Sequence, residues 1–89
     1  TMPESVDVRI RFFGKARELM LCEEKWATVP THIAYPQLKN LIFHELYSDL
    51  QSIETACILA VDHRYLSDAE VVNLCSASEI AVIPPLSGG

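Results

Sequence analysis

The sequence predicts an α+β protein in which one mixed β-sheet of about five strands is covered on one face by one main helix. Three observations lead to this fold class. The chain has 89 residues, which is enough for one small domain. A stretch that alternates apolar and polar side chains lies near the start of the chain, short apolar stretches lie in its second half, and a stretch with apolar residues three and four positions apart lies between them. The expected order is strand, strand, helix, strand, short strand, strand.

The first two strands are expected to form a hairpin. Residues 6–12 have the two-residue period of a half-buried strand, with an apolar row of Val6, Val8, Ile10 and Phe12. Gly14 breaks this run, and residues 15–21 are expected to form a short connector. Glu24 to Val29 is predicted to be the second strand, which Pro30 ends. The connection is longer than a tight turn, but a hairpin is the simplest link between the two strands.

The main helix is predicted to begin at Tyr35 and Pro36, because a proline in the first turn loses no helical hydrogen bond. Apolar residues then recur three and four positions apart, at Leu38, Leu41, Ile42 and Leu46. This spacing places one apolar stripe of the helix against a core. The pattern fades at Ser48, where the helix is expected to end.

The second half of the chain is predicted to supply the remaining strands. They are a buried strand over residues 57–61, a short return strand at Tyr65 and Leu66, and a last strand over residues 80–83. Residues 68–78 are expected to be irregular. Because the helix lies between the two groups of strands, the first and last strands are expected to pair in parallel in the middle of the sheet. This is the β-grasp, or ubiquitin-like, architecture.

Composition and charge exclude several classes of function. The net charge of −5 argues against non-specific binding of nucleic acid. The longest apolar run, residues 56–61, is far shorter than the roughly 20 residues of a membrane-spanning helix. No basic stretch followed by an apolar one marks a secretory signal, so we expect a cytosolic protein with no membrane partner. Residues 40–89 are strongly acidic and either suit a basic partner surface or form a solubilising face.

No residues have the spacing of a catalytic or metal site. The three cysteines, Cys22, Cys57 and Cys75, include no Cys-x-x-Cys pair, which argues against a zinc site and a disulfide framework. Cys57 and Cys75 are expected to be buried structural thiols, and Cys22 is a candidate for an exposed one. The histidines, His32, His44 and His63, lie in unrelated segments. We therefore expect no metal, no tightly bound cofactor and no self-sufficient active site.

The tail, residues 84–89, follows a domain expected to span residues 1–83 and is the segment best suited to a function. Its residues are Pro84, Pro85, Leu86, Ser87, Gly88 and Gly89. The prolines favour a stiff, extended exit, and the glycines carry no side chain that would block a narrow channel. Extended at about 3.3 Å per residue, the tail reaches roughly 20 Å. We expect it to insert its terminal carboxylate into another protein's active site, the alternative being an idle flexible tail.

Two segments of the chain resemble one known family. The sequences AVIPPLSGG at residues 81–89 and VRIRFFGKAREL at residues 8–19 are similar to the ending and opening of the small, sulfur-carrier subunit of molybdopterin synthase. The resemblance spans most of the chain and is weakest between Glu23 and Ser52. Thiamine-pathway carriers and ubiquitin-related modifiers share the Gly-Gly ending but usually lack the Pro-Pro-x-Ser stem. Residues 75–78 depart from the family, because many members have a Gly-containing acidic turn there.

The resemblance implies that Gly89 is the reacting residue. In this family a separate enzyme of the ubiquitin-activating type uses ATP to convert the carboxylate of the last glycine to an acyl-adenylate. Sulfur transfer then makes a thiocarboxylate, which gives its sulfur to a pterin precursor on the large synthase subunit during molybdenum cofactor biosynthesis. The chain would thus be a sulfur-donating subunit, without catalytic side chains of its own, in a complex of two small and two large subunits.

Phe13, Tyr65 and Ile83 are predicted to form a docking patch for these partners. Alternation places Phe13 and Ile83 on the face of the sheet away from the helix, with Tyr65 beside them. Family members have an apolar docking patch at the matching positions, and an exposed apolar cluster usually marks a contact surface. The alternative is that Phe13 is tucked under a loop.

Other functions remain open at this point. A protein modifier of the ubiquitin type would use Gly89 for conjugation to lysines of target proteins. A sulfur carrier of another pathway, for thiamine or for tRNA thiolation, would use the same thiocarboxylate. A third class is a structural β-grasp interaction module whose tail is idle.

Overall fold

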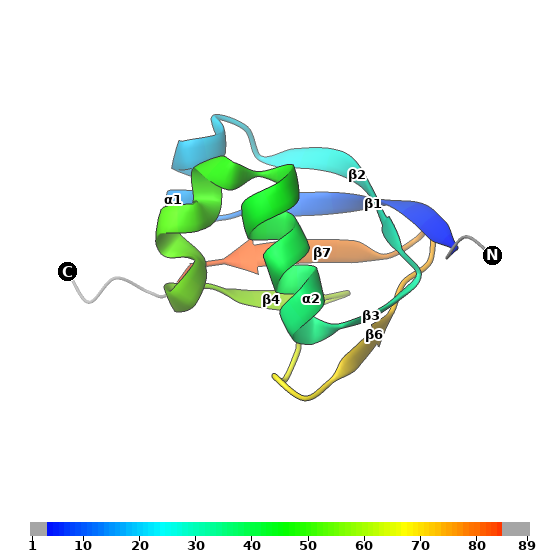
Figure 1. Cartoon of the computed structure of the whole chain (residues 1–89). Coiled ribbons are helices and arrows are strands. Elements are labelled where there is room, and N and C mark those ends of the chain that lie inside the picture. The colour runs from blue at the N-terminus through cyan, green and yellow to red at the C-terminus, as the bar shows by residue number, and fades with distance from the viewer. Residues whose placement is uncertain (1–3, 85–89) are drawn as a thin grey trace.

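A computed structural model describes residues 4–84, and its central element is a five-stranded mixed sheet (Figure 1). The strands lie in the spatial order β2-β1-β7-β4-β5. Their bounds are β1 (Ser5–Phe12), β2 (Glu24–Pro30), β4 (Ile58–Val61), β5 (Arg64–Tyr65) and β7 (Glu79–Ile83). β1 and β7 run parallel, and the other neighbours are antiparallel. The predicted hairpin and the predicted central parallel pair are confirmed.

Helical segments cover one face of this sheet (Figure 1). They are α2 (Tyr35–Asn40), a π-helical turn over Leu41–Leu46 and a 3₁₀ segment over Ser48–Ala56. α2 begins at Tyr35, as predicted, with Pro36 in the first turn, where no N–H is required. The Tyr35 hydroxyl accepts a hydrogen bond from the Leu59 N–H at 3.4 Å, which ties the start of the helix to β4. Helical structure runs past the predicted end at Ser48, because Leu50 is fully buried in the core.

The hydrophobic core lies between the sheet and the helical layer. The predicted alternation is confirmed on two central strands, where one row is buried: Val8, Ile10 and Phe12 on β1, and Ile80 and Val82 on β7. On β4, Leu59, Ala60 and Val61 are all buried. The helical layer contributes Leu38, Ile42, Phe43 and Leu50. Residues between those of the buried rows face the opposite side of the sheet. We call this second side, which the helical segments do not cover, the open face.

The segment predicted to be a connector, residues 15–21, instead contains the helix α1 (Gly14–Met20). Ala16 is fully buried and Leu19 packs against the core, so apolar contacts hold one side of the helix in place. Leu21 ends α1 in the left-handed conformation, with φ of 59°, and its N–H donates to the Arg17 carbonyl at 2.9 Å. The prediction was wrong because a helix of seven residues is too short to show a clear apolar period.

Residues 68–78, expected to be irregular, contain the strand β6 (Val71–Asn73). It pairs antiparallel with β3 (His32–Ala34) in a separate two-stranded sheet. Only Val72 of β6 is buried, so the strand carries a single core-facing residue. Three-residue strands give too little alternation to be predicted from sequence.

Within residues 4–84, no helix has both the length and the apolar character required to cross a membrane. The longest continuous helical stretch, α2 together with the π-helical turn that follows it, spans residues 35–46.

Candidate functional site

The open face carries a pocket of about 210 Å³ that brings together the three residues predicted to form a docking patch. Phe13 and Tyr65 are 40% and 63% exposed, and Ile83 is half-buried. The pocket is completed by Arg11, Ala60, His63, Glu79 and Ala81. Phe13 is therefore not tucked under a loop, and the expected placement on the open face is confirmed. The docking role of these residues stays a prediction.

The register of four strands builds the pocket. Arg11 of β1 is paired with Ala81 of β7, Ala81 with Ala60 of β4, and Ala60 with Tyr65 of β5. Two alanines thus lie side by side between a guanidinium and a phenol ring. Because a methyl group is the smallest side chain that a non-glycine residue presents, this row forms a low floor between taller neighbours. Phe13 extends the wall, since its N–H donates to the Val82 carbonyl at 3.3 Å and continues the pairing of β1 with β7.

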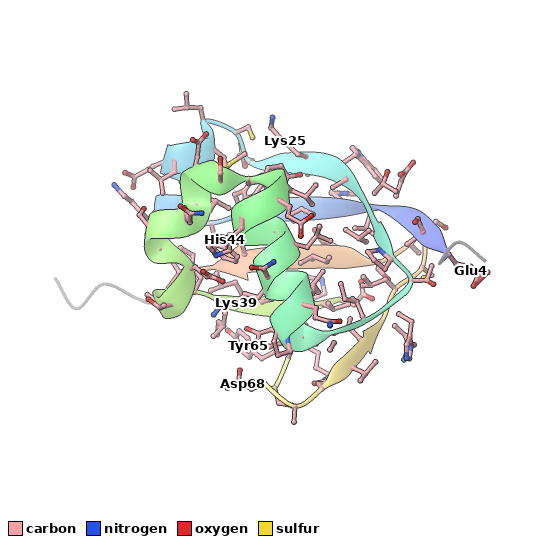
Figure 2. The ribbon with its side chains drawn as sticks, viewed as in Figure 1. Glu4, Lys25, Lys39, His44, Tyr65 and Asp68 are labelled. Atoms are coloured by element: carbon pink, nitrogen blue, oxygen red, sulfur yellow. The ribbon has the colours of Figure 1, made fainter. Side chains whose placement is uncertain are left out.

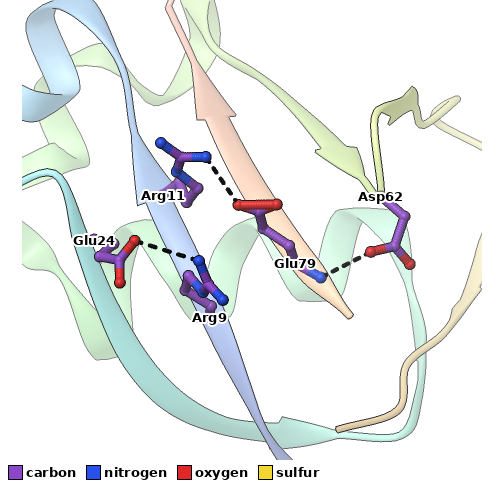
Figure 3. Close-up of polar contacts among 5 residues, drawn as sticks. All are labelled: Arg9, Arg11, Glu24, Asp62 and Glu79. Carbon is purple, nitrogen blue, oxygen red and sulfur yellow. Dashed lines mark hydrogen bonds and ion pairs between the residues drawn. The ribbon is translucent and has the colours of Figure 1, made fainter. Parts of the chain in front are cut away.

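A polar network holds one rim of the pocket (Figure 3). Arg11 donates from Nη1 to Oε2 of Glu79 at 3.3 Å, across the parallel pair β1–β7. The Glu79 N–H in turn donates to Oδ1 of Asp62 at 3.0 Å, and the Asp62 N–H donates to the Glu79 carbonyl at 3.0 Å. Asp62 therefore fixes the backbone of Glu79, whose carboxylate then positions the guanidinium of Arg11.

The turn between β4 and β5 places His63 at the same rim. Asp62 and His63 both have positive φ, 49° and 71°, which is the combination that a two-residue hairpin turn of type I′ requires. Glycine or asparagine usually occupies such positions, so Asp62 and His63 adopt an unfavourable backbone conformation beside the pocket. Arg64, the first residue of β5, forms an ion pair with Glu70, and the hydrogen bond between their side chains lowers the pKa of the Glu70 carboxyl. The pair tethers the loop that follows Tyr65. Figure 2 labels Tyr65 and, in this loop, Asp68.

The chain leaves the sheet beside the start of α1. Gly14 has φ of +52°, and the point where a Cβ would lie on Gly14 is 3.4 Å from Cγ of Pro84. Pro84, the last described residue, therefore packs next to Gly14. It follows Ile83 at the end of β7, close to Phe13. The other predicted tail residues, Pro85, Leu86, Ser87, Gly88 and Gly89, lie outside the described residues, so their roles stay predictions.

The cysteines are placed differently from expectation in one case. Cys57 is buried, as predicted, and Cys22 is half-buried, but Cys75 is exposed. Cys75 begins a tight turn in which its N–H donates to Oγ of Ser78 at 3.0 Å. Ser78 occupies the buried position of this turn instead, which is why the prediction for Cys75 was wrong.

The histidines lie in three separate environments. His44 contacts Glu54 at 2.5 Å and Gln51 at 2.7 Å on the helical layer (Figure 2). His32 contacts Asn73 at 2.6 Å between β3 and β6, and His63 lies at the pocket. Among residues 4–84, no group of three or more His, Cys, Asp and Glu side chains has the arrangement needed to hold a metal ion.

We predict that Cys75 reacts with iodoacetamide at lower pH than Cys57. The Ser78 hydroxyl, 3.6 Å from the thiol, lowers the pKa of Cys75, whereas burial raises the pKa of Cys57. Because only the thiolate is nucleophilic, the exposed cysteine with the lower pKa is alkylated first. Peptide mapping by mass spectrometry across a pH series measures this order. The difference should vanish in denaturant, and faster labelling of Cys57 in the folded protein would contradict it.

Comparison with known proteins places the chain in a family. No family model matches the chain. The molybdopterin synthase sulfur carrier subunit of Caenorhabditis briggsae is 40% identical to it over 84 residues, which cover 94% of this chain and 99% of that relative. The subunit of the same name from Caenorhabditis elegans is 38% identical, with the same coverage. The chain belongs to the molybdopterin synthase sulfur carrier subunit family. The resemblance seen in the two end segments is thus confirmed over nearly the whole sequence.

Solved structures support the fold of this sulfur carrier family member. One chain, from a complex of subunits 1 and 2 of the molybdopterin-converting factor of Helicobacter pylori, superposes with a TM-score of 0.63 at 22% identity, covering 97% of this chain and 100% of that chain. The small archaeal modifier protein 1 of Methanosarcina acetivorans superposes with a TM-score of 0.61 at 21% identity, covering 97% and 99%. At these identities the likeness concerns the fold alone, and it confirms the predicted β-grasp architecture.

Several residues of the pocket in this sulfur carrier subunit were not predicted as site residues. Arg11 and Ala81 lie on rows that alternation assigns to the open face, so their side of the sheet was predictable. Ala60 and His63 required the register of β4 with β5 and β7, which no local pattern in the sequence encodes. Glu79 lies just before the predicted start of the last strand. The hydrogen bond from the Arg11 side chain to its carboxylate forms only because β1 and β7 are parallel neighbours.

Proposed function

We propose that this chain carries sulfur as a thiocarboxylate on Gly89 and donates it to a pterin precursor in molybdopterin synthase. The observation that carries the proposal is the identity of 40% with a molybdopterin synthase sulfur carrier subunit over 94% of this chain and 99% of that relative. The Gly88-Gly89 ending in the sequence supplies a carboxylate on a side-chain-free segment. A small domain that presents such a tail suits delivery of a reactive group to another protein's active site.

The chemistry proceeds in two steps on partner proteins. The carboxylate oxygen of Gly89 attacks the α-phosphate of ATP, which releases pyrophosphate and leaves an acyl-adenylate. A sulfur nucleophile then attacks the acyl carbon and displaces AMP. This step needs the adenylate because AMP is a far better leaving group than the oxide ion that would have to leave an unactivated carboxylate. ATP belongs to the adenylating enzyme, of the ubiquitin-activating type. We propose that this chain itself holds no metal and no tightly bound cofactor, and that it binds no nucleic acid.

The partners are proposed to dock on the open face. The Helicobacter pylori chain with the same fold comes from a complex of two subunits, which supports a large subunit as a partner here. We further propose a heterotetramer of two small and two large subunits. The adenylating enzyme is proposed to dock on the same face when the large subunit is not bound there. An assembly that must detach for reloading with sulfur is expected to use a small, reversible interface. Such a cycle is proposed to operate in the cytosol.

Mass spectrometry of the chain co-expressed with its adenylating enzyme tests the proposed function. We expect the intact protein to gain the mass difference of one sulfur replacing one oxygen, and fragmentation to place it on Gly89. A Gly89-deleted chain, expressed in the same way, is the control and should show no gain. Isopeptide-linked adducts to lysines would instead favour a protein modifier, and an unmodified chain would favour an interaction module. Either result would reject the sulfur-carrier role.

A further inference from the structure

The pocket on the open face has the shape of a receptacle for one side chain. Its floor is the pair Ala60 and Ala81, and its walls are the ring of Phe13, the ring of Tyr65 and the aliphatic chain of Ile83. The volume of about 210 Å³ equals that of roughly seven water molecules in the liquid. Water on an apolar floor of this kind makes few hydrogen bonds, so a partner's apolar group that displaces it gains affinity.

Arg11 at the rim has unused hydrogen-bonding capacity. Its Nε atom is buried and has no acceptor among residues 4–84. Its Nη1 contact with Glu79 is 3.3 Å long, at the upper limit for a strong hydrogen bond, and its Cζ lies 5.5 Å from the centre of the Phe13 ring. A buried donor without a partner costs free energy, and a planar guanidinium matches a carboxylate through two parallel hydrogen bonds.

We propose that the large subunit inserts one apolar side chain, between leucine and phenylalanine in size, into this pocket, and presents a carboxylate next to it. Arg11 turns from Glu79 to that carboxylate as the two proteins dock. This inference rests on the proposed function, because it names the contact through which the proposed partner is held. The positive charge and accessibility of Arg11 support the second half, since the Arg11 side chain is 38% exposed and its Nε has no acceptor among residues 4–84. The Glu79 side chain is 22% exposed, and the backbone of Glu79 is held by Asp62 (Figure 3).

The geometry makes a prediction that a flat apolar patch does not make. Ala81→Leu adds apolar surface to the open face but fills the floor of the pocket. If one partner side chain occupies the pocket, this variant should raise the Kd for the large subunit by about tenfold or more, because overfilling a packed site is strongly unfavourable. If the partner merely covers an apolar face, the extra methyl groups should leave the Kd unchanged or lower it.

The binding experiment uses the full chain and the purified large subunit, with Kd measured by titration calorimetry. Ala69→Leu, in the exposed turn after Tyr65, makes the same chemical change outside the pocket and should bind like the wild-type chain. Melting temperatures of both variants should match that of the wild type, because neither Ala81 nor Ala69 is among the buried core residues. A wild-type Kd for Ala81→Leu, in a folded protein, would overturn the pocket proposal.

A second pair of variants tests Arg11 and does not depend on Ala81. Arg11→Gln should raise the Kd at least severalfold, and added salt should weaken the wild-type complex more than the complex of this variant. Glu79→Gln should lower the Kd, because it removes the anion that competes with the partner's carboxylate. Weaker binding of Glu79→Gln, or unchanged binding of Arg11→Gln, would reject the proposed carboxylate. Failure of the wild-type chain to bind would count against the proposed function itself, which separates the two inferences.

Discussion

Replacing Ile83 with aspartate is expected to weaken binding of the large subunit and of the adenylating enzyme by about a hundredfold or more, because burying an unpaired carboxylate costs several kcal/mol. Ile83 is half-buried at the end of β7 and is paired with Ile58 of β4, which is 44% exposed. The two isoleucines extend the apolar surface from the pocket toward the point where the tail leaves the sheet. A partner that takes up the tail must pass this surface. Surface plasmon resonance with each purified partner measures both effects.

The control for this variant is Val71→Asp. Val71 is 48% exposed on β6, in the separate two-stranded sheet, so the same change introduces a carboxylate on a strand but outside the open-face pocket. We expect Val71→Asp to bind both partners like the wild-type chain. Ile83→Asp should keep a melting temperature close to that of the wild type, because its side chain already faces solvent in part. If Ile83→Asp binds either partner normally, the two partners do not share this surface.

The strands that carry the core were predictable because β1 alternates apolar and polar side chains, whereas β4 and β7 contain short apolar runs that end at a polar turn or at prolines. On β1, Val8, Ile10 and Phe12 are buried and the arginines between them are not, and on β7 Ile80 and Val82 are buried around a half-buried Ala81. The helix start was predictable because Pro36 is compatible with only a few backbone positions. These features are local, so nothing beyond neighbouring residues is needed to recognise them.

The features that were missed depend on contacts between distant segments. β3 and β6 are stable because Val72 is buried and because Thr31 accepts a hydrogen bond from Leu74 at 2.8 Å, and neither fact is visible in a three-residue pattern. The pocket likewise exists because Ala60 and Ala81 meet in register. Two alanines in separate strands carry no signal in the sequence. The site was therefore predicted as a set of exposed apolar residues, whereas its floor and its polar rim required the structure.

Deleting Gly89 is expected to abolish sulfur transfer while leaving the fold intact. The deletion moves the terminal carboxylate to Gly88 and shortens the tail by about 3.3 Å, a displacement that is large relative to the geometry an acyl-transfer step tolerates. The buried core residues lie between Val8 and Val82, so the melting temperature and the binding of the large subunit through the open face should not change. Activity and stability are thereby separated in one variant.

The measurement is conversion of the pterin precursor by the reconstituted synthase, with the wild-type, Gly89-deleted or Gly88→Ala chain treated with the adenylating enzyme, ATP and a sulfur source. Gly88→Ala is the matched control, because it keeps both the length of the tail and the carboxylate of Gly89 and adds one methyl group. It should retain activity unless the partner's channel is narrow or requires positive φ at Gly88, which glycine adopts without the strain that alanine would incur. The deletion should be inactive in either case, because the acyl group is then held short of its reaction partner. Full conversion with the Gly89-deleted chain would show that this residue does not bear the sulfur, and the sulfur-carrier function would have to be given up.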